Sequence, residues 1–207
     1  MKRIVMLAIL AVALPVAAFA GNVDFGNSGG TLTGNSTGLQ LVGSELTQVN
    51  GFAGLGLVQG SLGTLTFTTG ALISGPGSLQ TGGIFSGAGS TFVITGNGQG
   101  GIPNGVIFSG SFTGNITWTE DKPCGPNGEV CYTLSGEISG TWYNGTTVSG
   151  ATTQITFQTS SGGFMGGSIP LGSGNTVIGS VPEPGTLGLL GTGLVGMAGI
   201  IRKKLKA

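Results

Sequence analysis

Polar and apolar residues alternate along several stretches of the chain, which is the pattern of strands that bury one face. The longest stretch is residues 130–145, VCYTLSGEISGTWYNG. Its predicted buried face carries Tyr132, Leu134, Gly136, Ile138, Gly140 and Trp142. Its predicted open face carries Cys131, Thr133, Ser135, Glu137, Ser139, Thr141 and Tyr143. Residues 64–68, 115–120 and 152–159 alternate in the same way, so we expect strands there as well.

Glycine and asparagine separate these stretches. Asn-Gly pairs favour hairpin turns because glycine tolerates a positive φ, and five such pairs begin at Asn50, Asn97, Asn104, Asn127 and Asn144. Three similar segments, 70–75, 82–87 and 105–110, raise the alternative of a repeat solenoid, but their spacing is irregular. We therefore predict an all-β body over residues 21–180, an antiparallel β-sandwich of the jelly-roll kind.

The first 20 residues differ from this body. Lys2 and Arg3 precede an apolar run that starts at Ile4, and small residues stand at Ala18 and Ala20. This pattern predicts a secretory signal peptide over residues 1–20, helical in its apolar part, with cleavage before Gly21. An uncleaved N-terminal anchor is the alternative. In both cases we expect the body to be exported.

Residues 181–207 have three parts. The first is Val181, Pro182, Glu183 and Pro184, where the prolines can continue neither a strand nor a helix. The second is the uncharged run 185–201, a predicted hydrophobic transmembrane helix of about 25 Å, which is short for a bilayer core of about 30 Å. The third is a basic anchor that we expect to stay cytoplasmic, formed by Arg202, Lys203, Lys204 and Lys206.

These three parts, in this order, resemble the PEP-CTERM sorting signal of Gram-negative and related bacteria. The resemblance implies processing by exosortase, an integral-membrane cysteine protease or transpeptidase, while the N-terminal signal implies signal peptidase as the other partner during export. The resemblance also implies a precursor that is held transiently in the membrane through 185–201. The mature protein would then lie at the cell surface or outside the cell. A plain C-terminal anchor without processing is the alternative. The resemblance ends near residue 181 and implies no activity for the body, because such tails occur on unrelated bodies, some of them described as ice-binding.

Charge and composition exclude several functions. Between residues 21 and 181 one cation, Lys122, stands against six acids, which leaves the body with a net charge of −5. A surface with one cation cannot neutralise a row of phosphates, so we expect no nucleic-acid partner. The chain has no histidine, which removes imidazole catalysis and most zinc sites. We expect no catalytic residue, no metal and no cofactor in the body.

Cys124 and Cys131 are the two cysteines of the chain and flank a Pro-Asn-Gly turn. In an exported protein such a pair is expected to form a structural disulfide. If the two cysteines faced each other in a ladder, Trp118 would lie opposite Glu137, an apolar residue on the polar face. We therefore expect the register to shift by one residue. Either a bulge near Lys122 and Pro123 or cysteines in the loop beyond the ladder would produce that shift.

Acidic residues flank the same loop. Glu120, Asp121 and Glu129 offer oxygens for calcium, but their spacing matches no familiar calcium loop, so a solvated acidic tip is the preferred interpretation. Glu120 and Glu137 are the one pair considered for glycoside hydrolysis. Because alternation places these two carboxylates on opposite faces, we expect the body not to be an enzyme.

The observations together favour an exported structural or adhesive protein of the cell surface or extracellular matrix, with exopolysaccharide as a further expected partner. The first alternative is a carbohydrate-binding module that uses the rings of Trp118, Trp142, Tyr132 and Tyr143, or an ice-binding surface built from Thr-x-Thr pairs such as 117–119. A glycoside hydrolase is the third. Alternation directs both tryptophans inward, which favours the structural role, whereas an exposed and coplanar pair of rings would favour the module.

Overall fold

The computed structural model describes residues 21–75, 79–121, 124, 129–159, 163–179 and 193. The chain forms two compact units, one of residues Asn22–Ser180 and one of Met1–Gly21 with Val181–Ala207. The strands belong to the first unit. The helices predicted for 1–20 and 185–201 lie outside the described residues, apart from Gly193. Within the described ranges, no helix has the length and apolarity needed to cross a bilayer.

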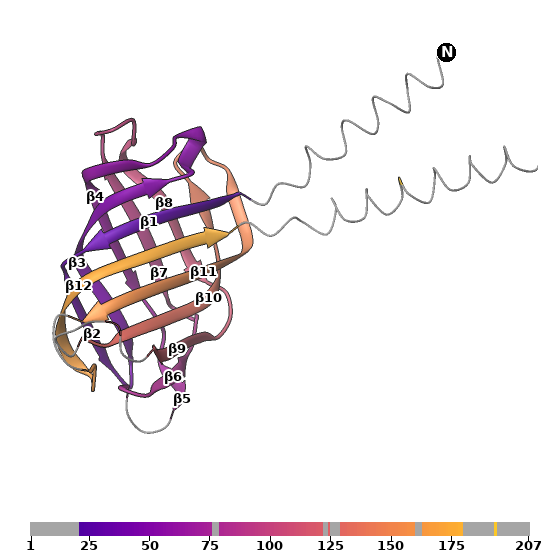
Figure 1. The fold of residues 1–207 in the computed structure, drawn as a ribbon. Coiled ribbons are helices and arrows are strands. Elements are labelled where there is room, and N and C mark those ends of the chain that lie inside the picture. The colour runs from indigo at the N-terminus through magenta and orange to yellow at the C-terminus, as the bar shows by residue number, and fades with distance from the viewer. Residues whose placement is uncertain are drawn as a thin grey trace, which may run out of the picture. The chain divides into compact units, whose positions relative to one another are not determined.

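The described residues of the first unit form twelve strands and one 3-10 turn (Figure 1). The strands are β1 (Asn22–Ser28), β2 (Thr31–Asn35), β3 (Gly38–Asn50), β4 (Val58–Thr68), β5 (Leu72–Ser74), β6 (Gly82–Phe85), β7 (Thr91–Asn97), β8 (Asn104–Phe112), β9 (Ile116–Asp121), β10 (Cys131–Trp142), β11 (Thr147–Thr159) and β12 (Gly167–Gly179). The turn η1 (Phe52–Gly54) follows β3. The shorter alternating stretches of the sequence fall in β4, β9 and β11, as predicted.

Four pairs of consecutive strands are each one longer strand with an interruption. β1 and β2 both lie antiparallel between β3 and β12. Between them stand Gly29 and Gly30, with φ of 63° and 88°. Glycine adopts such angles at little cost, so the chain kinks there and continues in the same direction. β8 and β9 likewise both pair with β10. The last two interrupted strands are neighbours: one consists of β4 and β5, the other of β6 and β7, and β4 pairs with β7 while β5 pairs with β6.

The sheet closes on itself. With each interrupted pair counted once, eight strands follow one another in chain order, each antiparallel to the next, and β12 returns to β1 and β2. Figure 1 shows β1, β12, β11 and β10 side by side on one wall of this up-and-down barrel. The similar segments 70–75, 82–87 and 105–110 contain parts of β5, β6 and β8 and are not coils of a solenoid.

The closed barrel corrects the predicted fold. An all-β antiparallel body is confirmed, but the sandwich with jelly-roll connections is wrong. Alternation along a strand shows only that one of its faces is buried. It does not distinguish a face buried against a second sheet from a face buried inside a closed one.

The meander places successive connections at alternate ends of the barrel. The connections after β3, β7 and β10 share one end with the pair formed by Asn22 and Gly179. We name this the terminal end. The connections after β2, β5, β9 and β11 share the other end, which we name the disulfide end.

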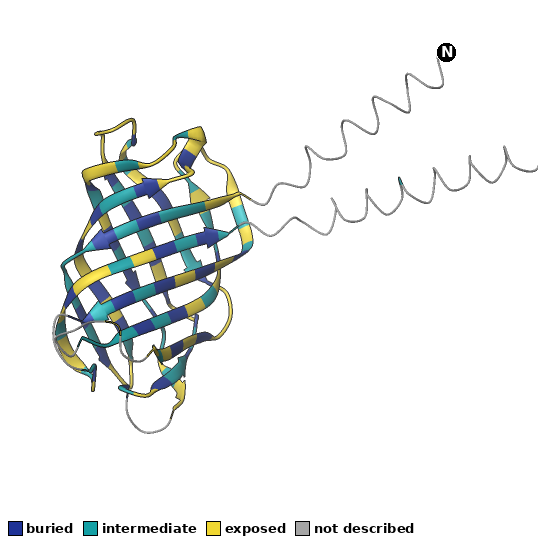
Figure 2. Ribbon diagram, viewed as in Figure 1, coloured by how far each residue is buried: buried dark blue, intermediate teal, exposed yellow. Residues whose placement is uncertain are grey.

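Buried and exposed residues alternate along the strands (Figure 2). Aromatic rings are prominent among the buried side chains inside the barrel. All nine phenylalanines among the described residues are buried, together with Trp118 and Tyr132. Phe67 and Phe157 bring their ring centroids to 5.7 Å across the interior. Eight strands enclose a space that side chains alone can fill. The centre is therefore a packed core.

The long strand β10 confirms the predicted alternation. Tyr132, Leu134 and Ile138 are completely buried, and Trp142 is half-buried. On the other face Glu137 is exposed. The period of two in the sequence is therefore sufficient to assign each side chain of β10 to its face.

The Asn-Gly pairs take several roles. Gly51, Gly98 and Gly145 have a positive φ in connections that follow a strand, as predicted for turns. Gly105 also has a positive φ but lies inside β8, so this pair forms no hairpin turn. The pair at Asn127 lies outside the described residues. Ala53 is the sole non-glycine residue with a positive φ in the described part of the chain. Asn50, Asn97 and Asn144 therefore have a negative φ, so the turns that they begin are not of type I′, which needs a positive φ at both central residues.

Candidate functional site

The predicted disulfide between Cys124 and Cys131 is present, with 5.6 Å between the two Cα atoms. Cys131 is the first residue of β10 and pairs with Asp121, whereas Cys124 lies beyond the end of β9. Trp118 lies opposite Leu134, three residues before Glu137, so the register shift is three residues and not the predicted one. A shift of one residue and a shift of three residues both place residues of the same face opposite each other, because side chains alternate with a period of two. The predicted bulge at Lys122 and Pro123 lies outside the described residues.

The acidic residues do not converge. Asp121 accepts a hydrogen bond from the Thr133 hydroxyl on the outer wall. Glu137, also on the outer wall, accepts one from the Thr113 hydroxyl at 3.0 Å. Glu120 follows Trp118 on the inward-facing side of β9, so it and Glu137 occupy opposite faces of the wall. No group of three or more metal-ligating side chains occurs in the part of the chain that the structure describes.

Two of the four candidate stacking rings are enclosed. Trp118 and Tyr132 stack with 4.6 Å between centroids and 6° between planes, and neither is more than 1% exposed. The pKa of the Tyr132 hydroxyl is raised, chiefly by burial. The hydrogen bond that the hydroxyl accepts from the Phe164 N–H lowers this pKa in part, and the nearby Glu120 carboxylate raises it further. The pair is coplanar but buried, so it offers no surface to a sugar.

The other two rings lie at the terminal end. Trp142 ends β10 half-buried, and its ring lies 4.8 Å from that of Phe108. The next residue, Tyr143, is 48% exposed. Both rings approach Phe52 of η1, at 5.8 Å and 5.4 Å. These two rings are therefore the aromatic surface that a ligand can reach.

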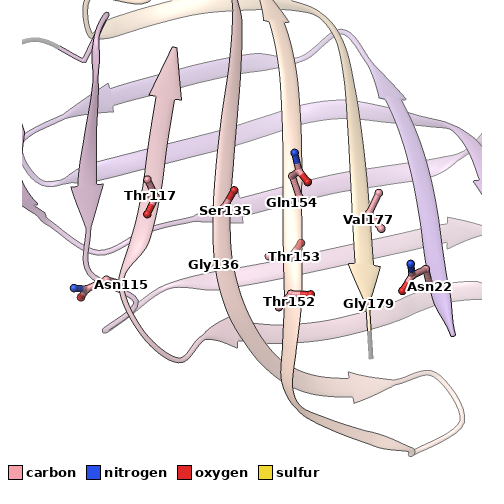
Figure 3. Close-up of a pocket in the computed structure, with 10 residues that line it drawn as sticks. All are labelled: Asn22, Asn115, Thr117, Ser135, Gly136, Thr152, Thr153, Gln154, Val177 and Gly179. Atoms are coloured by element: carbon pink, nitrogen blue, oxygen red, sulfur yellow. The ribbon is translucent and has the colours of Figure 1, made fainter. Parts of the chain in front are cut away.

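A hollow of 510 Å³ lies along the wall formed by β9, β10, β11, β12 and the start of β1 (Figure 3). We name it the polar groove. It is lined by Asn22, Asn115, Thr117, Ser135, Gly136, Thr152, Thr153, Gln154, Val177 and Gly179. Its volume lies within the range of about 300–1,000 Å³ that is usual for ligand sites.

Strand register builds the polar groove. Thr117 pairs with Ser135, Ser135 with Gln154, and Gln154 with Val177, so four strands contribute one row of outward side chains. A second row joins Thr152 to Gly179 and Gly179 to Asn22. Figure 3 shows these side chains spread along the neighbouring strands. Because Gly179 carries no side chain, it leaves room between Thr152 and Asn22 in the second row. Gly136 faces inward, where its missing side chain makes room for Phe112.

The lining of the polar groove is uncharged. Hydroxyl and amide groups provide donors and acceptors, and Val177 provides an apolar contact. Thr153 faces the interior of the barrel with Ala151 and Ile155 and is 2% exposed, so its hydroxyl is not among the groups that the groove presents. This lining suits a neutral molecule rich in hydroxyl groups.

Sequence reasoning named one residue of the polar groove. The Thr-x-Thr pair at 117–119 supplies Thr117. Asn22, Gln154 and Gly179 were missed, because only the register across β10, β11 and β12 brings them to the same hollow. No local motif in the sequence records that register.

The comparisons with known proteins concern the C-terminal segment. No curated protein and no solved structure matches the chain. The pattern of the PEP-CTERM protein-sorting motif matches residues 180–203, in the segment that carries Val181, Pro182, Glu183 and Pro184. This segment lies outside the described residues, apart from Gly193. Residues 180–203 are a PEP-CTERM protein-sorting motif, which marks the chain as an exported protein that is targeted to exosortase.

Proposed function

We propose that the barrel is a non-catalytic structural or adhesive protein of the cell surface or extracellular matrix, and that its polar groove holds a neutral polysaccharide. The uncharged lining of the groove carries this proposal. Polysaccharide hydroxyl groups both donate and accept hydrogen bonds, as do the threonine and glutamine side chains of the lining. An exported protein meets such polymers in the layer outside the cell.

The charge of the body supports a neutral ligand over an acidic one. Residues 21–181 carry one cation against six acids. A surface of net negative charge repels a polyanion at long range and gains little from it at short range. Binding through neutral hydrogen bonds also predicts little dependence on salt.

The shape of the wall favours a polysaccharide over ice. The hydroxyl rows follow a sheet that twists and closes into a barrel, so successive rows are not coplanar. A flexible glycan chain can follow this curvature, whereas an ice face is flat. For catalysis the separation of Glu120 and Glu137 onto opposite faces gives no support, because hydrolysis of a glycosidic bond requires two carboxylates that face the same bond.

Binding of residues 21–180 to neutral polysaccharides tests the proposal. This fragment contains the whole barrel, including the seam between β1 and β12. We expect retention on an insoluble neutral glucan, and retardation in gels that contain a soluble one. Gels that contain alginate, an acidic polysaccharide, should have no effect. Retention should persist in high salt.

Matched variants locate the site. Thr117→Val with Thr152→Val removes two hydroxyl groups from the polar groove and keeps β-branched side chains. Thr64→Val with Thr95→Val makes the same change at a cross-strand pair on the opposite wall. Hydrogen bonds of about 0.5–1.5 kcal/mol each predict roughly tenfold weaker binding for the first variant. The second should bind as the parent does. Equal binding by both variants would exclude the groove.

A filling variant gives an independent check. A Cβ at Gly179 would meet only the ends of two side chains, Asn22 Oδ1 at 2.9 Å and Thr152 Oγ1 at 3.3 Å. Gly179→Val should therefore fold, since these side chains can move aside, while its methyl groups occupy the hollow. We expect loss of polysaccharide binding with an unchanged circular dichroism spectrum. Full binding by this folded variant would contradict the proposal.

A further inference from the structure

We propose a second ligand site, at the terminal end of the barrel, which binds a single neutral pyranose ring such as the terminal unit of a polysaccharide. The inference rests on the proposed function for the class of ligand, but it concerns different residues. The site is a pocket of 190 Å³ lined by Val23, Phe52, Ala53, Trp142, Tyr143, Asn144 and Thr146. We name it the aromatic pocket.

Trp142 has an unused donor at this pocket. Trp118, the other tryptophan, donates its indole Nε1–H to the carbonyl of Leu79 at 2.8 Å. The indole Nε1–H of Trp142 has no acceptor among the described residues, and the side chain is only half-buried. A tryptophan that packs on the core with a free N–H at the surface presents both an apolar ring and a donor.

Packing fixes this ring in place. Phe108 approaches Trp142 to 4.8 Å and Phe25 stacks on it at 6.4 Å, so the core holds it from below. Phe52 contacts both Trp142 and Tyr143 and is itself 3% exposed. The half-exposed ring of Tyr143 forms a wall above this base. Little conformational freedom is lost when a ligand contacts rings that the core already orders.

Polar groups stand beside the rings. The backbone N–H of Thr146 donates to Asn144 Oδ1 at 3.0 Å, which fixes the turn after β10. Asn144 Nδ2 and Thr146 Oγ1 have no partner in the described part of the chain and are exposed. A pyranose presents C–H groups on one face and hydroxyl groups at its edge. The aromatic pocket offers rings for the face and an amide, a hydroxyl and an indole N–H for the edge.

Size and charge select the ligand. The pocket is smaller than the roughly 300–1,000 Å³ that encloses a drug-sized molecule, so it suits a single ring. No carboxylate or cation is among its lining residues, so charged sugars gain no ion pair. Asn22 lines the polar groove and Val23 lines the aromatic pocket. The two sites therefore meet at the rim of the barrel, on consecutive residues of β1.

Nuclear magnetic resonance tests the proposal without altering a tryptophan. The ¹⁵N-labelled protein, residues 21–180, gives two indole N–H signals because the chain has two tryptophans. The probes are the methyl glycosides of glucose, galactose and mannose at millimolar concentrations. We expect at least one probe to shift the Trp142 signal saturably and to leave the Trp118 signal in place. No shift of Trp142 with any probe would overturn the inference.

Variants separate this site from the polar groove. Tyr143→Ala should weaken glycoside binding about tenfold. The matched control Met165→Ala, at a side chain 74% exposed at the disulfide end, should change nothing. Thr117→Val with Thr152→Val should leave the Trp142 shifts intact. Polysaccharide retention without any glycoside shift would overturn the aromatic pocket and leave the proposed function standing. Glycoside shifts with normal retention by the groove variant would support the pocket and contradict the groove.

Discussion

Trp118 and Tyr132 stack face to face between β9 and β10, and each fixes a different connection at the disulfide end. The indole of Trp118 donates to the Leu79 carbonyl at 2.8 Å, in the connection after β5. The hydroxyl of Tyr132 accepts from the Phe164 N–H at 2.6 Å, in the connection after β11. One aromatic pair therefore holds two connections that are far apart in the sequence.

Removal of the Tyr132 hydroxyl should weaken this end of the barrel. Tyr132→Phe keeps the stacked ring and leaves the buried Phe164 N–H without an acceptor. An unsatisfied buried donor costs about 1–3 kcal/mol. We expect the free energy of unfolding in urea to fall by that amount. The Phe164 amide should exchange faster with deuterium.

Tyr143→Phe is the matched control, because Tyr143 is 48% exposed. Its hydroxyl removal should change stability by less than about 0.5 kcal/mol. Equal losses in both variants would show that the bond to Phe164 contributes nothing specific.

Stability should decline in alkali through Tyr132. Burial raises the pKa of its hydroxyl above 10.0, against the lowering effect of the Phe164 N–H and with a further rise from Glu120. Above pH about 10 the unfolded chain loses this proton while the folded chain retains it, so stability falls as pH rises toward the folded pKa. Below about pH 9 this group contributes no slope. Urea unfolding of the parent and of Tyr132→Phe at several pH values should show a smaller alkaline loss in the variant.

Absorbance gives a direct measure of the same group. In Tyr143→Phe the remaining tyrosine is Tyr132, since the chain has two tyrosines. The midpoint of its phenolate absorbance should lie above pH 10. A midpoint at or below about pH 10 would contradict the raised pKa.

The sequence was sufficient for the faces of single strands and insufficient for their assembly. Alternation placed Tyr132 inward and Glu137 outward correctly, because a period of two depends on local geometry alone. Closure of the barrel depends on Asn22 reaching Gly179, a contact between the two ends of the body. The polar groove depends on register across several strands, and the prediction for Trp118 gave the wrong shift. Long-range pairing leaves no local signature to read.

Close contact between β8 and β10 predicts a cost for added bulk. Gly140 lies directly opposite Gly110. A Cβ at Gly140 would lie 2.5 Å from the Ser109 carbonyl oxygen and 2.6 Å from Phe108 Cζ. Gly140→Ala should therefore lower the free energy of unfolding by about 1–3 kcal/mol. Gly114→Ala is the control, since a Cβ there meets nothing within 4 Å. A neutral Gly140→Ala would mean that the two strands separate easily.

The disulfide should stabilise the barrel by limiting the unfolded chain. Cys124 and Cys131 are seven positions apart, so the bridge closes a short loop. The chain-entropy relation gives about 2–3 kcal/mol for such a loop. We expect the free energy of unfolding to be lower by that amount in Cys124→Ser with Cys131→Ser, and likewise in the reduced parent. Both should therefore unfold at a lower urea concentration. The double variant should be indifferent to reductant. Equal stability of the oxidised and reduced parent would show that the bridge adds nothing.

Export should be visible in the oxidation state of the two cysteines. The sorting motif at 180–203 marks an exported chain, and a disulfide forms outside the reducing cytosol. In cells of an exosortase-bearing bacterium, rapid alkylation of the full-length chain should modify neither cysteine.

A variant without residues 2–20 should remain in the cytosol with both thiols free, because it lacks the predicted signal peptide. Deletion of 181–207 should leave oxidation intact if the predicted signal peptide directs translocation by itself, but should alter the final location. Free thiols in the full-length chain, with the C-terminal peptide still attached, would place the body in the cytosol and contradict export.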